Sequence, residues 1–201
     1  MKTCYTREQI ETSVKEKGYK WFEDNNDKGY DVNIVGVRNS DPTINKFNDY
    51  IATFWKYEGR WSYFECQATT LPGLKYMESP MNPKGCAILV PNQYKGVYKL
   101  GTHYTYTALV QTGGEVDVYR DDNKDMHYDM LDDTIISGYF GINIHKASEG
   151  ERENVDGYSA GCQVFQNSDE FEIFIDLCKK AEKYWGNKFT YTLLNQPVVT
   201  F

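Results

Sequence analysis

The sequence predicts a mainly β fold of the α+β class, with one helix before the strands and one helix plus a strand at the end. Aromatic residues make up 15% of the chain, with 17 Tyr and 10 Phe, and such residues favour pleated sheets. Between the two ends, short apolar runs are bounded by Gly, Pro or Asn, as strands usually are. Helical periodicity is confined to two segments, near 6–18 and 168–186.

The first helix has recognisable start and stop signals. Thr6 is placed to cap it, Gln9 occupies the reciprocal position of a capping box, and Gly18 is placed to end it. We therefore expect an N-terminal helical segment over 1–28 and one larger domain over 29–201.

Strand-like runs fill the middle of the chain. Glu58-Gly59 predicts a turn between two strands, Pro91 interrupts another pair, and Gly113-Gly114 predicts a hairpin. The runs are YDVNIVGVRN, YIATFWKYEGRWSYFECQATT, KGCAILVPNQYKGVYKLG, YTALVQTGGEVDVYR, GYFGINIH, YSAGCQVF and, last, KFTYTLL.

The second helix is predicted near 169–185, with Ser168 as its cap and Gly186 as its stop. Its apolar positions recur at helical spacing and predict a buried stripe, made of Phe171, Phe174, Ile175, Cys178, Ala181 and Trp185.

Charge and cysteine content narrow the class of protein. The net charge is −7, which disfavours nucleic acid as a partner because phosphate contacts need clustered Lys and Arg. The sequence contains no run of about 18 apolar residues, so it predicts no membrane span. Five Cys at no disulfide-framework spacing predict reduced thiols and synthesis in the cytoplasm, and we find no export signal. The sequence indicates no oligomeric state.

One stretch brings together two reactive residue types. GINIHKASEGERENVDGYSAGCQVF contains His145 and, 17 positions later, Cys162. A thiol becomes a nucleophile as the thiolate, so it needs a base nearby, and a histidine supplies one. Two adjacent antiparallel strands would bring the side chains together. The alternative is that both are ordinary core residues.

Order and spacing exclude several classes of cysteine enzyme. Papain-like and amidase-type enzymes place Cys before His, the reverse of this order. Caspase-like and sortase-like enzymes place His first, but at separations of roughly fifty residues.

His145, then a loop, then Ser159-Ala160-Gly161-Cys162 resembles the L,D-transpeptidase catalytic-domain family. VPNQYKGVYKLG is similar to that family's Thr-Pro-x-Gly-x-Tyr strand pair, and GINIH to the strand that carries its histidine. Together with KGYKWF and FTYTLL, these segments most resemble phage and prophage endolysin-like proteins of that fold, over about 17–195.

The resemblance implies an L,D-transpeptidase-like β-sandwich and a peptidoglycan-degrading cysteine peptidase. It would act on the stem peptide or cross-link through a Cys162 thioacyl intermediate, with bacterial peptidoglycan as partner and no cofactor. It would be made in the host cytoplasm without a signal peptide and reach the cell wall through holin-dependent release. The alternatives are a transpeptidase that forms cross-links and a non-catalytic wall-binding or virion module.

The implied site has a catalytic set, an oxyanion hole and a substrate-binding pair. The catalytic residues are Cys162 as nucleophile, His145 as base and then acid, and Ser159, which braces the turn or donates to the histidine. The backbone N–H groups of Gly161 and Cys162 would hold the oxyanion, and the side chains that would touch substrate are Tyr158 and Gln163. A backbone carbonyl often orients the histidine in that family.

Two positions depart from the family pattern. Ala160 stands where many members have His, and Val164 stands where many have Arg. Outside the motif, His103 and His127 are expected to be polar surface residues. The remaining cysteines are expected to be core or surface thiols, namely Cys4, Cys66, Cys86 and Cys178.

An acidic stretch, DDNKDMHYDMLD, has oxygen-bearing side chains at the positions used by an EF-hand loop. Met126 stands where that loop needs Gly, and the flanks predict strands. A solvated turn is favoured over a calcium site. The candidate ligands of the calcium alternative are Asp121, Asn123, Asp125, Asp129 and Asp132.

Overall fold

The computed structural model describes residues 5–41 and 43–196; Cys4 lies outside them. Within that part the chain is mainly β, and a long helix in its second half lies between the last two strands. This confirms the predicted β-rich α+β class. The strands are β1 (Asn33–Arg38), β2 (Asp49–Tyr57), β3 (Arg60–Thr69), β4 (Cys86–Leu89), β5 (Gln93–His103), β6 (Tyr106–Gln111), β7 (Val116–Asp121), β8 (Ile136–Gly138), β9 (Ile144–Lys146), β10 (Gln163–Phe165) and β11 (Phe189–Asn195). The helices are α1 (Arg7–Glu16), α2 (Leu74–Glu78), the 3₁₀ turn η1 (Asp132–Thr134) and α3 (Ser168–Trp185).

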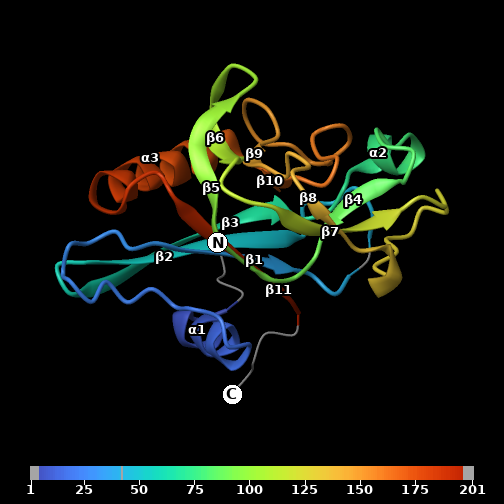
Figure 1. Cartoon of the computed structure of the whole chain (residues 1–201). Helices are drawn as coiled ribbons and strands as arrows, with labels where there is room; N and C mark the ends of the chain where they lie inside the picture. The colour runs from blue at the N-terminus through green and yellow to red at the C-terminus, as the bar shows by residue number, and fades with distance from the viewer. Residues whose placement is uncertain (1–4, 42, 197–201) are drawn as a thin grey trace.

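Eight strands close into a barrel in the order β1-β11-β5-β6-β9-β10-β3-β2, and β4, β7 and β8 form a separate three-stranded sheet (Figure 1). The structure therefore differs from the expected β-sandwich, because its main sheet closes into a barrel. The barrel closes because β11 pairs in parallel with β1 and antiparallel with β5, so the main sheet joins its own ends.

The core is continuous between the barrel and the smaller sheet. Leu89 of β4 and Val118 of β7 belong to the same buried cluster as Ile34, Cys66 and Tyr191 of the barrel. The stripe predicted on α3 enters this cluster, except that Trp185 is only half-buried and Leu177 is buried in addition. Packing of both sheets on one core fixes their relative position, and the candidate site depends on that position.

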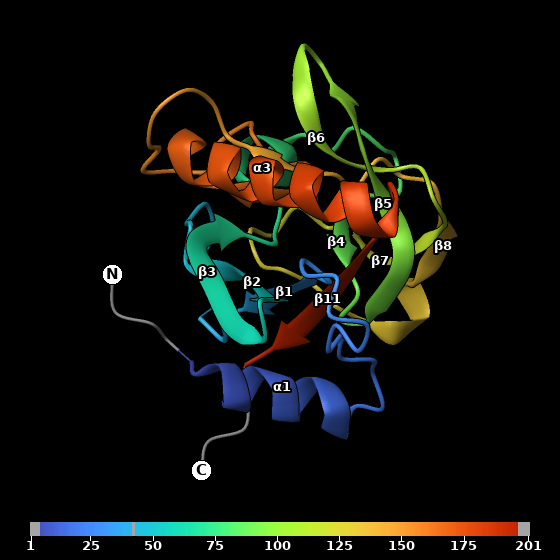
Figure 2. The same ribbon diagram turned by 90° about the vertical axis from the view of Figure 1, so that its left-hand side faces the viewer.

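Helix α1 packs on the other side of the strands from α3, as Figure 2 shows. Its capping box is confirmed, because the Thr6 and Gln9 side chains each accept from the other residue's backbone N–H. Ile10 and Val14 are buried against Val35 and other residues of β1, β2 and β11. The helix thus covers the barrel wall.

The two predicted turns have different outcomes. Between β2 and β3, Glu58 and Gly59 both adopt positive φ, as a tight hairpin turn requires, and the prediction is confirmed. The hairpin at Gly113-Gly114 is wrong, because β6 and β7 belong to different sheets. The Gly113 N–H donates to the Val97 carbonyl, so this segment crosses between the two sheets and does not turn back.

Helix α3 begins one residue earlier than predicted. Asn167 is the N-cap, and its side chain accepts from the backbone N–H groups of Asp169 and Glu170. The Ser168 hydroxyl instead accepts from the Gly150 N–H at 2.9 Å, and so joins α3 to the preceding loop. Gly186 ends the helix with φ of 79°. In the part of the chain that the structure describes, neither α3 nor any other helix is long and apolar enough to cross a membrane.

Candidate active site

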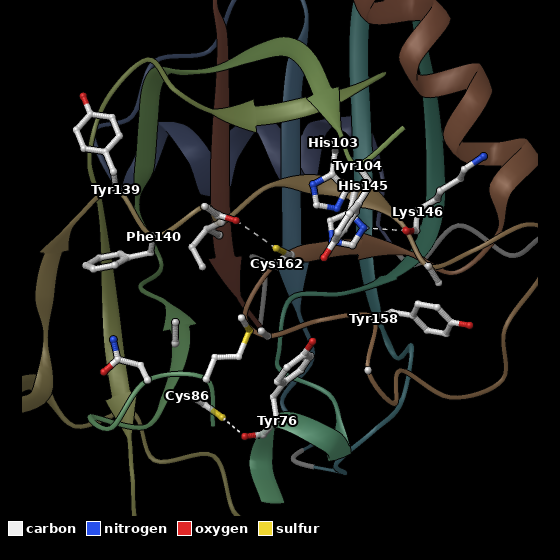
Figure 3. Close-up of a pocket in the computed structure, with 18 of the residues that line it drawn as sticks. Tyr76, Cys86, His103, Tyr104, Tyr139, Phe140, His145, Lys146, Tyr158 and Cys162 are labelled. Atoms are coloured by element: carbon white, nitrogen blue, oxygen red, sulfur yellow. Dashed lines mark hydrogen bonds between the residues drawn. The ribbon is translucent and has the colours of Figure 1, made fainter. Parts of the chain in front are cut away.

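A cleft of about 730 Å³ lies between the end of the barrel and the smaller sheet. Its walls come from the β5–β6 hairpin, the segment before β9, the start of β4 and the chain leading into β10. His145 and Cys162 both line this cleft, and Figure 3 shows the Cys162 thiol directed at the Gly141 carbonyl, with the His145 ring on the other side of Cys162.

Strands β9 and β10 are the elements that bring the two residues together. They are neighbours, as expected, but they pair in parallel, with Gln163 opposite Ile144, so the antiparallel prediction is wrong. A parallel pair needs a crossover of a dozen or more residues, and residues 147–162 supply it. His145 therefore lies inside β9, while Cys162 comes directly before β10.

The His145 ring is oriented by backbone. Its Nδ1 lies 2.8 Å from the Lys146 carbonyl oxygen, which only accepts, so Nδ1 carries the proton. The Nε2 atom is then the unprotonated nitrogen, the form needed in a general base. Burial, with His103 close by, lowers the pKa of His145 to about 4. The resting imidazole is neutral at pH 7.

Cys162 is half-buried at the base of the cleft. Its thiol donates to the Gly141 carbonyl at 3.4 Å, and the Asn143 backbone N–H favours the thiolate form. Burial outweighs that N–H and raises the pKa of the thiol to about 11. At neutral pH both groups are therefore uncharged, one a thiol and the other an imidazole.

The turn before Cys162 is held by Ser159. The buried Ser159 hydroxyl donates to the Cys162 carbonyl at 2.9 Å and accepts from the Gly161 N–H at 3.1 Å. Of its two predicted roles, bracing the turn fits these contacts. The same contact engages the Gly161 N–H, so its assignment to the oxyanion hole is wrong, and the Cys162 N–H remains from the predicted pair.

Gly161 is required at its position. Its φ is 125°, and a Cβ there would lie 2.3 Å from the Ala87 carbonyl oxygen of β4. Any side chain would therefore be strained and would also strike backbone. This close approach fixes the nucleophile turn against the smaller sheet.

The two residues predicted to bind substrate lie in different environments. Tyr158 lines the cleft and is half-buried. Gln163 is fully buried, donates to the Gly161 carbonyl and accepts from the Tyr191 hydroxyl at 2.8 Å, so its assignment to substrate binding is wrong. Val164 is also buried, and it packs in a cluster with Phe47 and Val155.

The structure adds residues to the site that the sequence reasoning missed. His103 was expected at the surface, but it is half-buried in the cleft and stacks on His145 with ring centroids 4.3 Å apart. The Tyr106 hydroxyl lies 3.5 Å from His145 Nδ1 and donates to the Lys146 carbonyl at 3.3 Å. Both residues flank the turn of the β5–β6 hairpin, and no motif in the sequence linked that hairpin to β9. His127 is exposed, as predicted.

The acidic stretch forms a turn without a metal site. The Asn123 and Asp125 side-chain oxygens accept backbone N–H groups two residues further on, and the Asn123 amide donates to Asp129 at 2.6 Å. Met126 takes the positive φ that an EF-hand loop gives to Gly. Within 5–41 and 43–196, no group of three or more His, Cys, Asp or Glu side chains is placed to hold a metal ion. These observations fit the solvated turn; they do not bring Asp121, Asn123, Asp125 and Asp132 together as ligands.

The cleft of this β-rich domain thus holds a cysteine and a histidine, and the histidine carries its proton on Nδ1 and has an unprotonated Nε2. No family model, no curated protein and no solved structure matches the chain.

Proposed function

We propose that the protein is a cysteine peptidase that cuts bacterial peptidoglycan in the stem peptide or its cross-link. The observation that carries the proposal is the orientation of His145. Its Nδ1 proton is committed to the Lys146 carbonyl, so Nε2 is the basic atom, and the Cys162 thiol lies in the same cleft. The choice of peptidoglycan rests on the resemblance carried by His145 and Ser159-Ala160-Gly161-Cys162.

In the first half of the reaction His145 Nε2 takes the thiol proton as Cys162 Sγ adds to the peptide carbonyl carbon. In this proposal the Cys162 N–H binds the developing oxyanion. The Asn143 N–H stabilises negative charge on sulfur before the bond forms. The C–N bond then breaks, and the imidazolium returns its proton to the leaving amine. A thioester and a free amine result.

In the second half, water attacks the thioester and His145 Nε2 takes the proton from that water. The C–S bond breaks, a carboxylic acid leaves and Cys162 regains its proton from the imidazolium. An amine in place of water would give a new peptide bond, so a transpeptidase uses the same steps with a different acceptor.

Digestion of purified sacculi tests the proposal, with Cys162→Ser and His145→Gln as matched variants. We expect the wild type to release muropeptides that mass spectrometry identifies, and each variant to be at least about a hundredfold slower, since one acid–base partner alone supplies about that factor. Shortened stems indicate a carboxypeptidase, lost cross-links an endopeptidase and new cross-links a transferase. Sacculi left unchanged by the wild type would refute the peptidase and favour a wall-binding or virion module.

A further inference from the structure

The charge of the cleft differs from the charge of the chain. The sequence has 29 Asp and Glu against 22 Lys and Arg, yet the residues lining the cleft include no Asp or Glu. Its charged residues are Arg120 and Lys146. A cleft lined by charge of one sign attracts ligands of the opposite sign, so this one favours a substrate that carries an anionic group.

The two cations are not equally available. Lys146 Nζ lies 2.6 Å from a Glu149 carboxylate oxygen and 3.1 Å from one of Glu172, so its charge is compensated. Among the described residues no carboxylate pairs with Arg120. Its Nη1 donates to the Gly85 carbonyl at 3.2 Å, and its buried Nε has no hydrogen-bond partner within 5–41 and 43–196. Most of the guanidinium's five N–H donors are thus unused by the described part of the chain.

Arg120 is held beside the nucleophile turn. It lies on β7 opposite Ala87 of β4, and Ala87 is the residue whose carbonyl closely approaches Gly161. Its guanidinium also stacks over the Phe140 ring, 4.8 Å from the centroid. The backbone carbonyl of the next residue, Gly141, accepts a hydrogen bond from the Cys162 thiol.

The direction from Cys162 to Arg120 differs from the direction to the base. Figure 3 shows Phe140 on one side of Cys162 and His145 on the other. Since His145 must protonate the leaving amine, the amine side of the scissile bond lies toward His145. The acyl side then extends toward Phe140 and the guanidinium stacked on it.

We propose that Arg120 is a specificity-determining residue that binds a carboxylate on the acyl side of the scissile bond. This rests on the proposed peptidase function and names the group by which the cleft selects its substrate. The planar guanidinium suits a carboxylate, because it presents two parallel N–H donors to the two oxygens. Stem peptides of peptidoglycan carry such carboxyl groups, either free or amidated.

The test compares two synthetic stem peptides, one with its acyl-side carboxyl groups free and one with them amidated. Binding is measured by calorimetry in a Cys162→Ala background, which prevents turnover. We expect the free peptide to bind about tenfold to a hundredfold more tightly, the range for a hydrogen bond to a charged group. Adding Arg120→Gln should remove that preference. Arg60→Gln, at an exposed position of β3, makes the same charge change away from the cleft and should leave it intact.

Equal affinity for the two peptides, no binding of the free peptide, or a preference that persists in the Arg120→Gln variant would each overturn the inference. Cleavage is measured separately with the otherwise unaltered chain. There Arg120→Gln should raise KM for the free peptide with little change in kcat, as loss of a uniform binding contact does. A protein that binds the free peptide through Arg120 but cuts nothing would refute the peptidase and support the carboxylate site.

Discussion

The two neighbours of the His145 ring act on its pKa in opposite directions. The Lys146 carbonyl fixes the tautomer, and its hydrogen bond raises the pKa. Burial, the largest effect, and the stacked His103 both lower the pKa and keep the ring neutral. The Asn143 side-chain amide lies 3.1 Å from His103 Nδ1 and donates to it, which favours the neutral form of His103. Burying a neutral histidine beside a neutral thiol costs much less desolvation free energy than burying the same two groups in their charged forms.

The buried His145 makes stability depend on pH. Its pKa is about 4 in the folded protein, against 6.5 as the ordinary value, so the unfolded chain takes up a proton first as pH falls. The contribution of the neutral ring is fully present above pH 6.5 and is lost as pH falls to about 4, which amounts to about 3 kcal/mol. We expect the free energy of unfolding of the wild type to fall by about that much more than that of His145→Gln between pH 7 and pH 4. Urea unfolding at several pH values measures it, and parallel curves for the two proteins would contradict it.

The site residues divide by whether local sequence determines them. His145, Cys162, Ser159 and Gly161 belong to one stretch, and their chemistry and spacing identified them. His103 was missed because nothing near it in the sequence shows that β6 will pair with β9, which happens through one residue pair, Leu109 and Ile144.

Gln163 shows the opposite error. It stands next to the nucleophile in the sequence, but successive side chains of a strand point to opposite faces. Its side chain therefore enters the core, where it meets the Tyr191 hydroxyl.

The crossover between β9 and β10 depends on Asn45. The Asn45 side-chain oxygen accepts from the Leu74 and Asp156 N–H groups, its amide donates to the Asp156 carboxylate, and its backbone carbonyl accepts from Val155. Asn45 adopts a φ of 68°, which Asn tolerates better than most residues. One side chain thus fixes the loop that delivers Cys162.

We expect Asn45→Ala to loosen this crossover. Loss of three side-chain hydrogen bonds and strain at positive φ should lower the free energy of unfolding by about 2–4 kcal/mol. Hydrogen exchange of the amides in 154–160 should become faster, and peptidase activity should fall. Asn45→Gly removes the same hydrogen bonds without the strain, so it should cost about 1 kcal/mol less. Unchanged amide protection in both variants would show that other contacts hold the loop.

Strand pairing shows the limit of local sequence at the level of elements. The β2–β3 hairpin was predictable because Glu58-Gly59 itself sets the turn. The absence of a β6–β7 hairpin was not predictable. Gly113 is needed where its backbone comes close to the Gly96 carbonyl oxygen, because a Cβ there would lie 2.3 Å from that oxygen. Both pairs of residues contain a glycine and both predict a turn, and only the packing of the two sheets distinguishes them.

The barrel and the smaller sheet are joined by a buried arginine. Arg38, at the end of β1, donates to the Thr70 hydroxyl and carbonyl and to the Leu89 carbonyl of β4. Asp49, also buried, accepts from the Thr70 N–H and hydroxyl and from the Asn39 N–H. The cleft lies between the two sheets, so this network helps to set the shape of the site at a distance from it.

We expect Arg38→Met to lower the free energy of unfolding by about 3–5 kcal/mol, because it leaves a buried carboxylate without its cation and buried carbonyls without a donor. Arg60→Met, an exposed arginine of the neighbouring hairpin, should change it by less than about 0.5 kcal/mol. Urea unfolding followed by tryptophan fluorescence measures both. A loss below about 1 kcal/mol in Arg38→Met would mean that the core alone holds the two sheets together.

The position of β11 has a consequence for how the protein is made. This strand, at Phe189–Asn195, lies between β1 and β5 and is the last strand of the described chain to be synthesised. Until it leaves the ribosome, β1 lacks one neighbour and the barrel stays open, although His145 and Cys162 have already emerged. Such distant pairing folds slowly. A nascent chain would therefore hold Cys162 in an unfinished fold until this last strand pairs with β1 and β5.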